Sequence, residues 1–121
     1  MKIPHSFRES AQFRNHAAGS VIFEFGQPGD EMFIVEEGEV DIVLAGKVLE
    51  TVPADGFFGE LALIDHEPRS TSAIARTDCR LLVLNQHRFM FLVDEVPFFA
   101  INVMKIMADR LRRASSVEKT P

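Results

Sequence analysis

The chain has 121 residues, of which 46% are hydrophobic and 26% charged, and its formal net charge at pH 7 is −5. This composition is typical of one globular domain and excludes a disordered chain. The negative charge argues against nucleic acid as the main partner, because phosphate backbones bind concentrated positive charge. No apolar run reaches the roughly 18 residues of a membrane span. The N-terminus lacks the apolar block of a signal peptide, so we expect a cytoplasmic protein.

The chain contains one cysteine, Cys79. It cannot form an internal disulfide, and no cluster of cysteine and histidine offers the ligands of a metal site. We therefore expect neither a bound metal nor a cofactor. No linker or repeat divides residues 1–121, which we expect to form a single domain.

The first predicted element is a short helix within residues 6–18, where apolar residues are too sparse for a long one. From about residue 19 the pattern changes to short alternating runs that predict strands over 21–25, 32–35, 40–44, 48–52, 72–76 and 80–84. Turn residues such as Gly26-Gln27-Pro28-Gly29-Asp30 separate these runs. A turn signal about every 8–12 residues is typical of an all-β sandwich or barrel.

The C-terminal third is expected to be helical. Residues 86–93 contain no turn residue, and Pro97 suits the first turn of a second helix. One apolar stripe follows along that helix at spacings of three and four: Ile101, Met104, Ala108 and Leu111. The stripe can either pack on the strands or pair with a second copy of the chain as a short coiled coil.

Three arginines near the end of this helix, Arg110, Arg112 and Arg113, fit the negative end of the helix dipole better than a contact with DNA. The predicted architecture is a β-roll over about residues 19–85 with C-terminal helices over about 86–114.

The segment between residues 57 and 72 carries the chemistry. Gly59 precedes one predicted helical turn, residues 60–64, and a helix start behind a glycine presents free N–H groups to an anion. Glu60 would repel a plain anion at that place. The conflict disappears if the anion also bears hydroxyls, because a carboxylate accepts from a sugar hydroxyl while Arg69 pairs with a phosphate.

Residues 57–75, FFGELALIDHEPRSTSAIA, resemble the phosphate-binding cassette of the cyclic nucleotide-binding domain family. That family includes catabolite-activator-type regulators, cAMP-dependent kinase regulatory subunits and cyclic nucleotide-gated channels. Residues 26–38, with Gly26-Gln27-Pro28-Gly29-Asp30 and Glu37-Gly38, resemble its second signature. The likeness extends over roughly residues 10–114. It implies a mainly β fold, a double-stranded β-helix or jelly-roll with flanking helices.

The resemblance also implies roles for single residues. Glu60 would accept from the ribose 2′-OH, Arg69 would pair with the equatorial phosphate oxygen, and Ser70 would add a hydroxyl contact. The N–H groups of Gly59, Leu61 and Ala62 would complete the phosphate cradle. The expected apolar walls are Leu61, Leu63 and Val52.

Thr71 and Ser72 stand where many relatives have alanine and then threonine, a change that we expect to adjust the pocket. The last helix commonly covers the ligand in this family, which makes Arg110, Leu111 and Arg113 candidates for a lid.

The leading hypothesis is a cytoplasmic, non-catalytic sensor of cAMP or cGMP, with cAMP favoured, whose C-terminal helices respond to the ligand and act on an unknown protein partner. Ser70 could serve a guanine edge, so cGMP stays open. A nucleotide-free scaffold that uses the β-roll as an interaction surface is the first alternative, although the intact pair of Glu60 and Arg69 speaks against it. Independently of this, Glu60 and Arg69 could form a structural ion pair that closes the loop. The second alternative is a regulator that acts on transcription only through another protein, since the chain stops at Pro121 without room for a recognition helix.

An enzyme is the least favoured class, because no nucleophile–base pair or metal cluster is visible. Asp65-His66-Glu67 is better explained as a solvated loop than as a metal or acid–base site.

Overall fold

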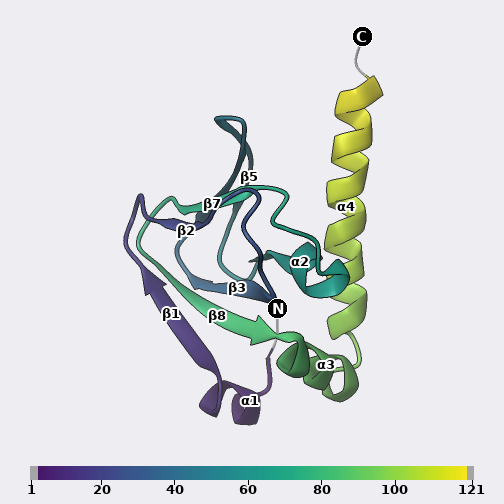
Figure 1. The fold of residues 1–121 in the computed structure, drawn as a ribbon. Coiled ribbons are helices and arrows are strands. Elements are labelled where there is room, and N and C mark those ends of the chain that lie inside the picture. Colours follow the sequence, from purple (N-terminus) through teal and green to yellow (C-terminus); the bar gives the residue numbers. More distant parts are fainter. Residues whose placement is uncertain (1–2, 120–121) are drawn as a thin grey trace.

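The structure is a computed structural model that describes residues 3–119, with side chains described as far as Ala114. The described residues form two four-stranded antiparallel sheets and four helices (Figure 1). The first sheet has the strand order β1 (Gln12–His16), β8 (Cys79–Asn85), β3 (Glu31–Glu37), β6 (Phe57–Phe58). The second has the order β2 (Val21–Phe23), β7 (Ser72–Ala75), β4 (Val40–Leu44), β5 (Lys47–Val52). The helices are α1 (His5–Glu9), α2 (Glu60–Asp65), α3 (Gln86–Glu95) and α4 (Phe99–Lys119).

The first sheet is buried on both faces, and its sequence shows why. Strands β3, β8 and β6 carry unbroken apolar runs: Met32 to Val35, Leu81 to Leu84, and Phe57 with Phe58. Because side chains alternate between the faces of a strand, each run supplies two cores at once. In β3, Phe33 and Val35 belong to one core and Met32 and Ile34 to the other.

The first core lies between the two sheets and contains a trio of phenylalanine rings. Phe33 and Phe58 stack at 5.2 Å between ring centroids, and Phe23 lies 5.9 Å from Phe58. The second core lies between the first sheet and the helices. It includes Leu92 of α3 and Phe99 of α4, both fully buried, so this core fixes the base of α4 on the roll.

Helix α4 rises beside α2 and extends past the roll (Figure 1). Its inner face is made by residues spaced like one face of a helix: Phe99, Val103, Ile106 and Arg110. The predicted apolar stripe faces the other way, with Ile101, Met104 and Leu111 exposed at 44%, 55% and 69%. The alternative in which this stripe packs on the strands is therefore wrong.

The predicted β-roll with flanking helices is confirmed, and the differences lie at element ends. The N-terminal helix ends at Glu9, and Phe13 belongs to a strand, β1, that pairs with β8. The strands therefore begin before position 19. Strand β2 stops at Phe23 because the following residues turn, with the Glu24 N–H donating to the side chain of Gln27. Helix α4 continues beyond the predicted position 114, to Lys119.

None of the described helices combines the length and apolar character that crossing a bilayer requires. The cytoplasmic location stays a prediction.

Two neighbouring phenylalanines offer a test of how α4 is anchored. Phe99 is 0% exposed and meets Phe89 edge to face, whereas Phe98 is 71% exposed. We expect Phe99→Ala to lower the free energy of unfolding by about 3–5 kcal/mol, because it leaves a cavity in the second core. Phe98→Ala should change it by less than about 0.5 kcal/mol. Urea denaturation followed by circular dichroism measures both, and equal losses would contradict this packing.

Candidate functional site

The site is built where β6 ends and α2 begins. Gly59 connects them with a left-handed φ of +81°. A Cβ there would lie 3.0 Å from Nη1 of Arg69 and 3.4 Å from the carbonyl oxygen of Glu31. Glycine thus supplies both the backbone conformation and the room for an arginine side chain. The close approach of a ligand to Gly59 stays a prediction.

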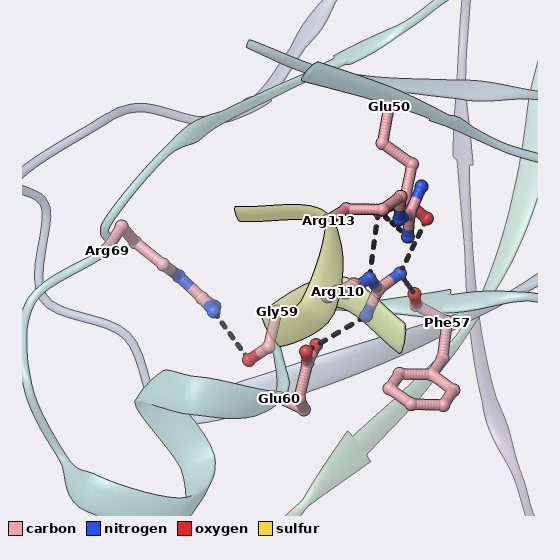
Figure 2. Close-up of polar contacts among 7 residues, drawn as sticks. All are labelled: Glu50, Phe57, Gly59, Glu60, Arg69, Arg110 and Arg113. Carbon is pink, nitrogen blue, oxygen red and sulfur yellow. Dashed lines mark hydrogen bonds and ion pairs between the residues drawn. The ribbon is translucent and has the colours of Figure 1, made fainter. Parts of the chain in front are cut away.

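Glu60 opens α2 and points into the molecule. It is 5% exposed, although an isolated carboxylate is rarely buried. Its Oε1 accepts a hydrogen bond of 2.9 Å from Nη1 of Arg110 on α4, which compensates the buried charge (Figure 2). Glu60 forms no ion pair with Arg69 among the described residues, so the two do not make the structural pair considered as an alternative.

Arg110 joins α4 to the roll through hydrogen bonds to two carboxylates and one main-chain carbonyl. Its Nε and Nη2 donate to the two carboxylate oxygens of Glu50 at 2.9 and 3.1 Å, and Nη2 also donates to the carbonyl of Phe57 at 2.6 Å. Burial works to lower the pKa of Arg110, but its bonds to Glu50 and the charges of Glu50 and Glu60 outweigh burial and raise that pKa. Arg113, one helical turn on, also donates to Glu50, at 3.3 Å.

Arg69 approaches the same segment from the opposite side (Figure 2). It is 6% exposed, and its guanidinium donates to two main-chain carbonyls, Nη1 to Gly59 at 3.0 Å and Nη2 to Glu31 at 2.9 Å. Its Nε is buried without a partner. Burial lowers the pKa of Arg69, and the charges of Glu31, Asp30 and Glu60 offset this only in part. Among the described residues no carboxylate lies within ion-pair distance of Arg69.

These groups surround a cavity of ≈ 480 Å³ between the roll and α4. Such a volume is typical of a site for a small molecule. The predicted site residues that line it are Gly59, Glu60, Leu61, Ala62, Arg69, Ser70, Thr71, Arg110 and Arg113. The fold thus brings the cassette and two of the three lid candidates to one place.

Three predicted residues do not line this cavity. Val52 is buried in the core between the sheets, and Leu63 in the core beneath the helices. Leu111 follows Arg110, and the helical turn of about 100° per residue carries it onto the exposed outer face of α4. The structure therefore does not support them as walls or lid of the site.

Six further lining residues were not predicted: Phe23, Ile42, Leu49, Glu50, Phe58 and Ala114. One of them, Glu50, could have been predicted from the alternation of side chains along a strand. If Val52 faces inward, Glu50 of the same strand should do so as well. A carboxylate facing inward from a strand is unusual unless it has a partner. That partner, Arg110, lies 60 residues further along the chain and could not be identified from spacing alone.

The arrangement suits an anion that also carries hydroxyl groups. Arg69 is a buried cation without a paired anion, and Glu60 is an acceptor at the same cavity. The loop Asp65-His66-Glu67 is exposed and does not line the cavity. Within the described part of the chain, no group of three histidine, cysteine or acidic side chains could hold a metal ion.

Comparisons with known proteins agree with this geometry. A family model described as the cyclic nucleotide-binding domain matches residues 13–96. A cyclic nucleotide-gated potassium channel of Mesorhizobium japonicum is 41% identical over 103 residues, which cover 85% of this chain and 28% of the channel. A cAMP-dependent protein kinase regulatory subunit of Aspergillus fumigatus is 39% identical over 84 residues, covering 67% of this chain and 20% of that protein. The chain thus spans a quarter or so of these relatives.

Solved structures share the fold. The Thermus thermophilus catabolite activator protein aligns with a TM-score of 0.79 at 30% identity, over 91% of this chain and 54% of that one. A structure from a cyclic-GMP-dependent signalling pathway of bacterial phytopathogenesis aligns with a TM-score of 0.66 at 34% identity, over 91% of this chain and 85% of that one.

The bonds of Arg110 predict a measurable contribution to stability. Arg110→Met would leave Glu60 and Glu50 without their main partner, and breaking a buried pair from one side costs about 3 kcal/mol. Arg112→Met is the matched control, because Arg112 is exposed on the same helix and its one ion pair among the described residues is with Asp109, at 3.7 Å. We expect urea denaturation without ligand to show a clear loss for Arg110→Met and no change for the control. Equal midpoints would mean that the ion pairs contribute nothing net.

Proposed function

The chain belongs to the cyclic nucleotide-binding domain family, and we propose that it is a non-catalytic regulatory module that binds a cyclic nucleotide, cAMP in preference to cGMP. The observation that carries this proposal is Arg69, a cation that is 6% exposed at a cavity and has no carboxylate partner among the described residues. A buried cation of this kind is stabilised when an anion of matching geometry binds, and a phosphate with two free oxygens fits a guanidinium.

Glu60 would recognise the sugar. An ionised carboxylate only accepts hydrogen bonds, and a ribose 2′-OH can donate one. Glu60 lines the cavity and is already oriented by Arg110, at 2.9 Å. Ser70 and Thr71 also line the cavity, where their hydroxyls would meet the phosphate or the base edge.

The same contacts would make α4 responsive to the ligand. Arg110, Arg113 and Ala114 of α4 line the cavity, and Arg110 spans it to reach Glu60. A nucleotide that bonds to Glu60 changes the surroundings of Arg110, and therefore the position that α4 prefers. The shift is limited by the difference in the ligand's affinity for the two positions.

The preference for cAMP is supported by relatives rather than by the cavity itself. One is the regulatory subunit of a cAMP-dependent kinase, and another is a cyclic AMP receptor protein. The structure from a cyclic-GMP-dependent pathway argues for cGMP. Calorimetric titration with both nucleotides tests the preference, and we expect the affinity for cAMP to be higher than the affinity for cGMP.

A second copy of the chain is the partner that we propose for the outer face of α4. Ile101, Met104, Ala108 and Leu111 form a stripe with the three–four spacing of a coiled coil, and three of them are exposed. Lys105 and Arg112 flank one side of the stripe, and Met107 and Ala114 the other. In a parallel pair each basic side chain meets an apolar neighbour, whereas an antiparallel pair would bring the basic residues together.

The role of Arg69 is tested by removing its side chain. Arg69→Ala should weaken cAMP binding by about 2–4 kcal/mol, or roughly 30- to 1,000-fold, because a charge-assisted pair is lost in a buried place. Arg76→Ala is the control, since Arg76 is exposed and does not line the cavity. If the wild-type chain binds neither nucleotide at millimolar concentration, the proposed function is wrong and the scaffold hypothesis takes its place. Wild-type affinity in Arg69→Ala would remove Arg69 from the site.

The proposed pairing of α4 is tested by light scattering on a size-exclusion column. The wild-type chain should have twice the mass of one chain, and Met104→Glu should have the mass of one, because it sets two like charges in the centre of the stripe. Asp109→Ala, on the same helix outside the stripe, should leave the mass unchanged. A wild-type mass of one chain at all concentrations would exclude this partner.

A further inference from the structure

The guanidinium of Arg69 lies against two residues outside the cassette, Phe23 and Gly29. Its Cζ is 4.1 Å from the centroid of the Phe23 ring in β2, close enough for a cation–π contact. A Cβ on Gly29 would lie 2.6 Å from the same Cζ and 2.7 Å from Nη2. No side chain fits at position 29 while Arg69 keeps this place.

Phe23 and Gly29 both lie close against the guanidinium. The centroid of the Phe23 ring is 4.1 Å from Cζ. A Cβ on Gly29 would come closer to Nε, Cζ and Nη2 than real Cβ contacts do. These two neighbours leave the guanidinium plane little room to tilt.

Hydrogen bonds fix the rotation of the guanidinium within that plane. Nη1 and Nη2 donate to the carbonyls of Gly59 and Glu31. A guanidinium has five N–H donors, so the hydrogen of Nε and the second hydrogen of each terminal nitrogen are not used by these two bonds.

The turn that contains Gly29 is also joined to the main chain of Arg69. The Arg69 N–H donates to the carbonyl of Gln27, and the Gly26 N–H donates to the carbonyl of Arg69, both at 2.8 Å. Residues 26–29 therefore contact both the backbone and the side chain of an arginine about 40 positions away. The turn at residues 26–29 and the end of the cassette are therefore held together by main-chain hydrogen bonds.

We propose that Phe23 and Gly29 are positioning residues, which hold the Arg69 guanidinium in its ligand-binding orientation before the phosphate arrives. The inference rests on the proposed function. Its physical reason is that a long, flexible side chain which is already ordered loses less conformational entropy when it binds. Neither residue needs to touch the phosphate for this effect.

Gly29→Ala is the sharpest test, because the added methyl group meets only the end of the Arg69 side chain among its nearest neighbours. Position 29 does not require a left-handed backbone, since its φ is outside the positive range. We expect cAMP affinity to fall about tenfold or more by calorimetry, with the circular dichroism spectrum of the folded chain retained. Pro28→Ala, at an exposed side chain of the same turn, should retain wild-type affinity.

A double-mutant cycle separates positioning from a general effect on the cavity. In an Arg69→Ala background, Gly29→Ala should lower affinity by less than about twofold, because there is no guanidinium left to displace. Equal losses in both backgrounds would overturn the proposal.

A second measurement does not depend on affinity. The Nε–H of Arg69 is buried close to an aromatic ring, so its NMR resonance should be protected from exchange and displaced by the ring current. Phe23→Leu should remove most of the displacement, leaving the smaller effect of the Phe33 ring at 5.9 Å. Phe25→Leu, at an exposed ring on the same segment, should keep it. A wild-type Nε–H resonance without a ring-current shift would overturn the proposed position of the guanidinium against Phe23.

The outcomes distinguish the two levels of inference. If the wild-type chain binds no cyclic nucleotide, the proposed function fails. If the wild-type chain binds cAMP and Gly29→Ala binds it equally well or more tightly, the function stands and the positioning role is wrong. That result would mean that Arg69 leaves Phe23 and Gly29 when the phosphate binds.

Discussion

A buried cation that forms no ion pair among the described residues, Arg69, is the constraint on which the rest of this structure depends. Desolvating one charge costs on the order of several kcal/mol even after relaxation. Arg69 recovers part of that cost from two carbonyl oxygens and from the ring of Phe23. No carboxylate completes the compensation among the described residues, and Nε stays unpaired. The fold therefore holds a cation without an ion pair beside a cavity, and this requires a rigid frame.

That frame comes from the sheet that is buried on both faces. Alternate residues of β3 and β8 belong to one core and the remaining residues to the second core. A one-residue slip of either strand would therefore move each set of side chains into the core that is packed for the other set. Phe23 and Phe58 of the first core line the cavity together with Arg69, and Phe99 of the second core fixes the base of α4. The two sides of the site are thus set by two different cores that share the same strands.

The sequence predicted the fold class because its local signals agree with one another: turn residues between alternating runs, and a helical stripe after Pro97. It predicted most of the site because the cassette is contiguous, from Gly59 to Thr71. What failed depended on tertiary contacts. Phe13 lies in a strand only because β8 offers it a partner, and Glu50 enters the site only because Arg110 reaches it across 60 residues. Leu111 was misplaced because the phase of α4 is set by Phe99 and Val103 in the second core.

Arg69 and Arg110 approach Gly59 and Glu60 from opposite sides, and their charges are compensated to different degrees. Arg110 is surrounded by carboxylates, which raise its pKa although burial works to lower it, so its charge is satisfied without any ligand. The pKa of Arg69 is lowered by burial. An anion entering the cavity therefore gains most by pairing with Arg69, while Arg110 has little to gain from it and keeps to Glu50 and Glu60. A hydroxyl on that same anion would instead compete for Glu60 and loosen only one of the bonds of Arg110, leaving the two to Glu50 in place. Under the proposed function, a ligand would therefore change the surroundings of α4 without releasing the helix from the roll.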